Sequence, residues 1–137
     1  MRLKLDQDLL GLSVMMERFA AVHVKDCFKE EDIVYFIVSP GELGKAIGKG
    51  GQTIKRVEQE LGKKIRVFEF SENITDFIRN IIYPLQIEEI MVESNHILLK
   101  DSHKKTKGLL IGRSGKGLVI LNRAVKRFFP DREVRVI

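Results

Sequence analysis

The sequence predicts an α+β protein made of two similar domains, residues 1–71 and 72–137, that pack closely together. Three observations lead to this fold class. The motif IGKGG at 47–51 returns 64 positions later as IGRSG at 111–115. Helix-type and strand-type hydrophobic patterns follow the same order in both halves, α-β-β-α-α-β. Of the 137 residues, 44% are apolar, which is enough for packed cores and argues against disorder.

An alignment of the two halves at this offset supports the duplication. The matched positions are glycines and apolar residues, which set backbone shape and core. They pair Gly44 with Gly108, Ile47 with Ile111, Gly48 with Gly112, Gly51 with Gly115, Ile54 with Leu118, Val57 with Leu121 and Leu61 with Val125. Lys49 falls on Arg113, so a cation stands at the same place in each motif.

In the first half, apolar residues at helical spacing predict an amphipathic helix over 7–20. Two strand-like stretches follow, VHVKDCF and IVYFIV, joined by the polar turn KEED. Pro40 precedes a short helix, which the glycine motif interrupts. A second helix then carries Ile54, Val57 and Leu61 on one face and ends at Gly62. The stretch IRVFEF is typical of a strand.

The second half repeats this order after a boundary near 71–73, where no flexible linker is apparent. Ile74, Phe77, Ile78 and Ile81 predict a helix that stops near Pro84. IEEIMVE and HILLK are strand-like and turn at 94–95. A short helix leads to IGRSG, a longer one follows, and Pro130 closes it. The last residues, EVRVI, alternate as a strand does.

Charge and composition indicate an anionic partner. The net charge is +5, and the positive residues gather around and after each glycine motif. Residues 45–66 hold seven Lys/Arg against two acids, and 96–137 hold eleven against three. Residues 67–95, by contrast, hold six acids and one Arg. No apolar run is long enough to span a membrane, and the N-terminus is unlike a signal peptide. We therefore expect a cytoplasmic protein with no membrane partner.

The glycine motifs have the chemistry of anion-binding loops. Glycine lets another backbone approach closely, and the following helix directs its positive dipole end at the loop. A P-loop, G-x-x-x-x-G-K-[ST], is excluded because Leu43 and Leu110 stand five residues before Gly48 and Gly115. The dinucleotide fingerprint G-x-G-x-x-G also fails in both copies. Phosphate is the expected guest.

These residues resemble a known family. IGKGGQTIKRV and IGRSGKGLVIL are similar to the I-G-x-x-G-x-x-[IL]-x-x-[ILV] core of KH domains, and the element order resembles their prokaryotic type. Two such units in tandem resemble the archaeal NusA-like factors of transcription termination and antitermination. The resemblance implies a single-stranded RNA-binding protein, with RNA polymerase or a transcription complex as a further partner, and no enzyme.

The resemblance also implies the binding residues. KH loops of the GXXG type clamp about four backbone nucleotides. The two loops would lie along the sugar–phosphate backbone, and apolar neighbours would form the floor of a groove for the bases. The RNA-binding residues expected on this basis are Ile47, Gly48, Lys49, Gly50, Gly51, Ile54, Lys55, Ile111, Gly112, Arg113, Ser114, Gly115, Lys116 and Leu118.

No catalytic or metal-binding pattern accompanies the loops. The lone Cys27 has only His23 nearby in sequence, and the three histidines, His23, His96 and His103, have no ligand spacing. We expect no catalytic residues, no metal, no cofactor and no small-molecule substrate, and we expect His103 to have a capping or surface role. Two alternatives remain open. One is a ribosome-associated or RNA-processing KH factor, and the other is a protein-interaction scaffold that does not bind RNA.

Overall fold

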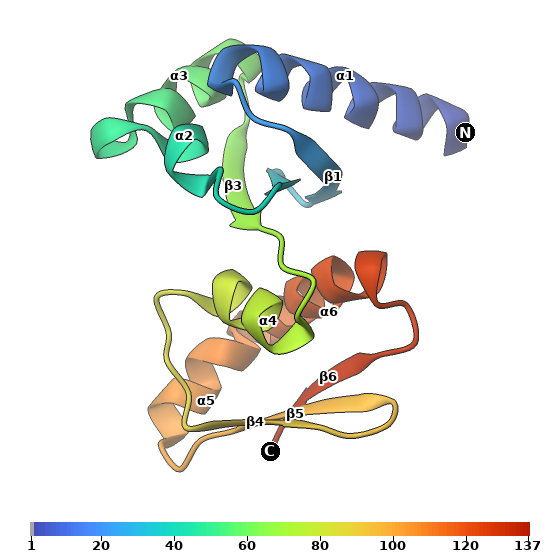
Figure 1. The fold of residues 1–137 in the computed structure, drawn as a ribbon, viewed down its shortest axis with the longest axis vertical. Helices are drawn as coiled ribbons and strands as arrows, with labels where there is room; N and C mark the ends of the chain where they lie inside the picture. Colours follow the sequence, from blue (N-terminus) through green and yellow to red (C-terminus); the bar gives the residue numbers. More distant parts are fainter. Residues whose placement is uncertain (1) are drawn as a thin grey trace. The chain divides into compact units, whose positions relative to one another are not determined.

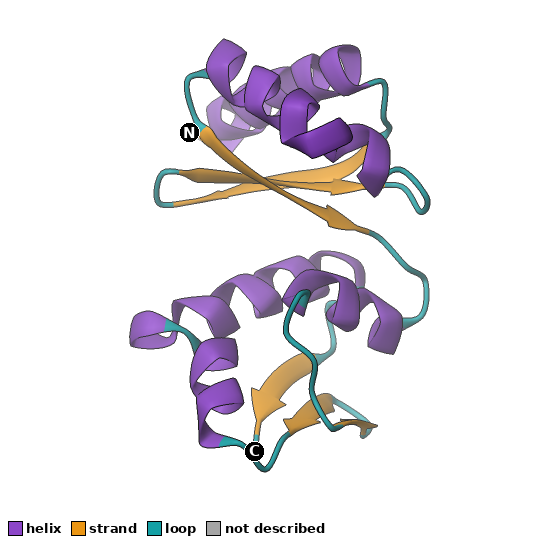
Figure 2. Cartoon of the chain, turned by 90° about the vertical axis from the view of Figure 1, so that its left-hand side faces the viewer, coloured by secondary structure: helices purple, strands orange, loops and turns teal. Residues whose placement is uncertain are grey.

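The computed structural model describes the backbone of residues 2–137 and the side chains from residue 9 onward. The chain divides into two units, residues 1–70 and 71–137. In each unit, helices lie on one face of a three-stranded sheet (Figures 1 and 2). Within the described part of the chain, no helix is both long enough and apolar enough to cross a membrane.

The first unit starts with helix α1 (Arg2–Ala20) and an antiparallel pair of strands, β1 (Val24–Glu30) and β2 (Ile33–Val38). The glycine motif follows as helix α2 (Leu43–Ile47), the 3-10 turn η1 (Lys49–Gly51) and helix α3 (Gln52–Leu61). Strand β3 (Lys64–Glu69) then runs parallel to β2, so the sheet order is β1-β2-β3.

The core of this unit lies between the helices and the central strand. Side chains alternate across a strand, so Val34, Phe36 and Val38 of β2 share one face. They belong to a buried cluster with Met16 of α1 and Val57 of α3. Because β2 pairs on both edges and is buried along nearly its whole length, its sequence is a continuous apolar run rather than an alternating one.

The second unit has the same order of elements. It contains α4 (Ile74–Ile82), β4 (Glu89–Val92), β5 (His96–Lys100), α5 (Lys104–Ile111), η2 (Arg113–Gly115), α6 (Lys116–Phe128) and β6 (Glu133–Val136). Strands β4 and β5 are antiparallel, β5 and β6 are parallel, and the sheet order is β4-β5-β6. Helix α4 begins where the Asn73 side chain accepts a hydrogen bond from the Asp76 amide at 3.0 Å.

The predicted fold class, two tandem α-β-β-α-α-β units, is confirmed. Two strands begin later than their patterns predict, at Val24 rather than 22 and at Glu89 rather than 87. The reason in both cases is a carboxylate that takes the backbone amide out of the ladder. The His23 amide donates to Glu42 Oε1 at 2.7 Å, and the Glu88 amide donates to Asp101 Oδ2 at 3.1 Å. Glu88 thus lies outside the strand that its sequence pattern predicts.

Candidate nucleic-acid interface

The first glycine loop makes a tight turn between α2 and α3. Gly48 ends α2 with φ 76° and ψ 170°, a conformation that residues with side chains rarely adopt. Gly50 and Gly51 also have positive φ, and the Gly51 amide donates to the Gly48 carbonyl at 3.1 Å. Helix α3 starts at the next residue, Gln52. The loop therefore presents Lys49 at its tip, directly in front of the positive end of the α3 dipole.

The second loop has the same backbone. Gly112 has φ 77° and ψ 171°, and Gly115 donates to the Gly112 carbonyl at 3.1 Å, as the matching residues of the first loop do. Ser114 takes the left-handed conformation of Gly50, with φ 57° and ψ 25°. Arg113 stands where Lys49 stands. Two loops of different sequence thus have one shape, and each has an exposed cation in the same place.

The first glycine of each loop is also required by space. A Cβ on Gly48 would lie 2.2 Å from the Thr53 Oγ1, and a Cβ on Gly112 would lie 2.6 Å from the Gly117 backbone nitrogen. Contacts this short do not occur between real side chains, so both backbone conformation and packing exclude any other residue. The loops are held against the second turn of the helix that follows them.

The apolar residues expected to form the groove floor differ in exposure. Ile47 and Ile111, the last residues of α2 and α5, are each 37% exposed, which is high for isoleucine beside a folded core. Ile54 is partly buried and packs against the core cluster of the first unit. Leu118 is also partly buried. Ile47 and Ile111 are therefore available to a ligand, whereas Ile54 at least also serves the core.

All fourteen expected residues lie on the two helix–loop–helix segments. Ile47 and Ile111 end α2 and α5, Gly48 and Gly112 follow them, and η1 and η2 contain the rest of each GXXG loop. Lys55 and Lys116 are exposed near the starts of α3 and α6. Within each unit the structure brings together the loop, its cation, one lysine of the next helix and the half-exposed isoleucine.

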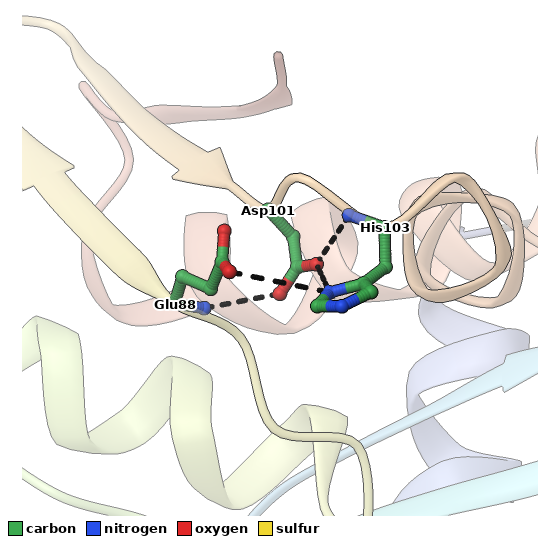
Figure 3. Close-up of side chains that lie close together, drawn as sticks. All are labelled: Glu88, Asp101 and His103. Carbon is green, nitrogen blue, oxygen red and sulfur yellow. Dashed lines mark hydrogen bonds and ion pairs between the residues drawn. The ribbon is translucent and has the colours of Figure 1, made fainter.

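A second polar cluster lies where α5 begins (Figure 3). Asp101 is only 4% exposed. Its Oδ1 accepts from the His103 amide at 2.8 Å and from the His103 Nδ1 at 2.9 Å, and its Oδ2 accepts from the Glu88 amide. Hydrogen bonds from the His103 amide above all, then from the His103 ring and the Glu88 amide, hold the pKa of Asp101 below its usual value of 3.8.

Glu88 completes this cluster. Its two oxygens accept from the Ser102 amide at 2.7 Å and from the Ser102 hydroxyl at 2.9 Å. The cluster therefore fastens the turn before α5 to the segment before β4. Sequence spacing did not predict it, because Glu88 and Asp101 are brought together by the β4–β5 hairpin. The residues Asp-Ser-His before a helix were the available signal, since aspartate often binds the backbone amide two residues on.

The same three side chains are the ones that a metal ion would need. Ligand atoms of Glu88, Asp101 and His103 all lie within 4.8 Å of one another. However, every carboxylate oxygen in the cluster already accepts a hydrogen bond from the turn. Because Asp101 is an acceptor only, the His103 Nδ1 must carry the proton in their 2.9 Å contact, so this nitrogen has no free lone pair for a metal. We assign the cluster a structural role.

Comparison with known proteins agrees with this architecture. The KH domain family model matches residues 13–96, more than half of the chain. The "Probable transcription termination protein NusA" of Methanocaldococcus jannaschii is 33% identical over 124 residues, which are 88% of this chain and 68% of that protein. The protein of the same name from Halococcus morrhuae is 27% identical over 99% of both chains. The crystal structure of APE1850 is similar with a TM-score of 0.82 and 28% identity, over 96% of this chain and 99% of that one. The chain therefore belongs to the KH-domain family and, within it, to the NusA-like proteins.

Proposed function

We propose that this protein binds single-stranded RNA and that its two loops, Gly48–Gly51 and Gly112–Gly115, clamp the sugar–phosphate backbone. The observation that carries the proposal is the identical shape of the loops. Two segments of different sequence share their backbone angles, their helix start and an exposed cation at the tip. A turn that only connected two helices would not require the same cation and the same close approach in both units.

The broader function follows from the family. KH domains bind single-stranded nucleic acid through loops of this type, and this chain is accordingly an RNA-binding, NusA-like protein. KH and NusA-like proteins are in general not enzymes, and we propose binding without catalysis. We also propose that residues 1–71 and 72–137 are separate KH domains, each with one loop.

Base recognition would take place beside the loops. Ile47 and Ile111, each 37% exposed, supply apolar contact, and Ile54 and Leu118 continue that surface toward the core. The chain has no Trp, and no aromatic residue interrupts the two glycine motifs. Recognition by van der Waals contact and by hydrogen bonds to base edges is therefore favoured over stacking on aromatic rings.

The role in the cell is proposed from the relatives. Several carry the name "Probable transcription termination protein NusA". We propose that this protein likewise acts in transcription termination or antitermination, with RNA polymerase or a transcription complex as its partner. A protein that acts on nascent RNA would work in the cytoplasm.

The test is a titration of single-stranded RNA of about a dozen nucleotides, enough for two footprints of about four. Two loop variants are compared with wild type at several salt concentrations, K49D/G50D and R113D/S114D. Gly50 has open space around its missing Cβ, and aspartate tolerates the left-handed conformation better than most residues, so the fold should survive. Each lost phosphate contact should flatten the log–log salt dependence by about 0.7.

The control variant is A21D/K25D, which makes the same change in formal charge away from the loops. Ala21 is exposed with φ 55°, where aspartate is tolerated, and Lys25 is exposed on β1, the edge strand on the far side of the sheet from β3. The proposal predicts wild-type slope for this control and weaker, flatter binding for both loop variants. Unchanged binding in the loop variants would mean that the loops are only turns, and a protein-interaction scaffold would then be the better description.

A further inference from the structure

The two helix–loop–helix segments differ strongly in charge. Residues 43–61 of the first unit contain four Lys/Arg and two Glu. Residues 104–128 of the second unit contain eight Lys/Arg and no acid. The two loops have the same shape, so this difference does not arise from the loops themselves. It indicates that the two units contribute unequally to the attraction of a polyanion.

Three lysines account for much of the difference. Lys104, Lys105 and Lys107 occupy the first turn of α5, and each is exposed or half-exposed. At the offset of 64 residues, the first unit has Pro40, Gly41 and Leu43 in their places. The cation of α2, Lys45, lies 3.5 Å from Glu42 and is partly neutralised by it. The first unit thus has nothing equivalent to this lysine segment at the matching positions.

The energetics of the helix do not explain these lysines. The start of a helix is the positive end of its dipole, where cations are unfavourable and acids are preferred. Helix α5 has no acid in its first turn. The negative charge that offsets the lysines comes from outside the helix, from the buried Asp101 and from Glu88 (Figure 3). A sequence that breaks a local rule in this way often does so at a functional site.

We propose that Lys104, Lys105 and Lys107 form a second set of RNA-backbone contacts, so that the second unit holds RNA more tightly, and with a steeper salt dependence, than the first. The inference rests on the proposed RNA binding. A helix rises about 1.5 Å per residue, so the lysines lie about 10 Å along α5 from Ile111 and the second loop. This distance is about one Debye length at 0.1 M salt, so phosphates held at the loop already feel these charges. A strand that continues past the loop along α5 would contact them directly.

The test variant is K104A/K105A/K107A in the full chain, titrated with the same RNA at several salt concentrations. Loss of three phosphate contacts should flatten the log–log slope by about 2. Extrapolated from 1 M salt, where this term vanishes, the affinity at 0.1 M should fall about a hundredfold. The thermal midpoint should not fall, because alanine is the best helix former and the substitutions remove charge from the unfavourable end of the dipole.

Two controls make the result specific. R18A/K25A/K29A removes the same number of cations, all exposed, from α1 and β1 of the first unit, and its slope should stay close to that of wild type. K104R/K105R/K107R keeps the charge, and its slope and affinity should also stay close to wild type. Wild-type slope and affinity in the alanine variant would overturn the inference and point to another anionic partner, such as an acidic protein, as the reason for these lysines.

The inference and the function beneath it fail differently. If the loop variants lose RNA binding while K104A/K105A/K107A keeps it, the loops bind RNA and the lysine segment does not. If wild type fails to bind RNA at any salt concentration, the proposed function fails and this inference fails with it.

Discussion

Gly117 offers the sharpest test of how the second loop is held in place. It lies in the first turn of α6, and a Cβ built on it would lie 2.6 Å from the Leu110 carbonyl oxygen and 3.1 Å from that of Ile111. The two helices touch backbone to backbone here, so no flexible side chain can yield. An ordinary contact begins near 3.4 Å, so G117A must move α5 from α6 by about 0.8 Å.

The cost of that movement can be estimated. Forcing an extra methyl group into a close-packed contact costs about 1–3 kcal/mol. Alanine returns up to about 1 kcal/mol through its higher helix propensity. A net loss of about 1–2 kcal/mol is expected, which for a unit of this size corresponds to a fall in the thermal midpoint of roughly 4–8 °C per kcal/mol. Because Gly112 lies against Gly117, RNA binding by the second loop should weaken as well.

The assay is chemical denaturation of G117A beside G108A. Gly108 is a helical glycine of α5 with nothing within 4 Å of its missing Cβ, so alanine there should be neutral or stabilising by up to about 1 kcal/mol. The pair therefore separates backbone contact from helix propensity on neighbouring helices. If G117A is as stable as G108A and binds RNA equally well, the close approach of α5 and α6 does not position the loop.

Two further predictions concern the second unit. S114G should stabilise the fold by about 1 kcal/mol, because Ser114 pays for a left-handed conformation with φ 57° that glycine adopts freely; denaturation measures this, and RNA affinity should be retained since Gly50 fills the same position in the first loop. D101N should destabilise the protein at neutral pH, because one of the oxygens that accept from His103 and Glu88 becomes an NH₂ group. The folded pKa of Asp101 is lowered, so its contribution is present above 3.8 and is lost as the pH falls through that lower pKa. The stability difference between wild type and D101N should thus shrink below about pH 4, and parallel pH profiles from pH 3 to 7 would contradict this assignment.

Much of the fold could be predicted from hydrophobic periodicity and from the punctuation of Gly and Pro. Gly62 ends α3 in the left-handed conformation, as expected of a glycine after a helix, and α4 ends two residues before Pro84. The duplicated motif predicted that both loops would lie between two helices. These features are local, and a short window of sequence determines them.

The features that could not be predicted depend on contacts between distant residues. Glu88 leaves its predicted strand because Asp101, thirteen residues away, captures its amide. The close contact of Gly117 with Leu110 depends on how two helices approach each other, which no periodicity reports. Ser114 has no sequence mark of a left-handed residue beyond its alignment with Gly50. Such details decide how the candidate site is held, although the order of elements does not depend on them.

The most direct test of the central claim is a residue-resolved NMR titration of the protein with single-stranded RNA, following the backbone amides. If both loops clamp the phosphate backbone, the amides of residues 48–52 and 112–116 should shift together and saturate at the same RNA concentration as the binding curve. Amide shifts confined to other parts of the chain, with both loops unmoved at saturation, would contradict the account.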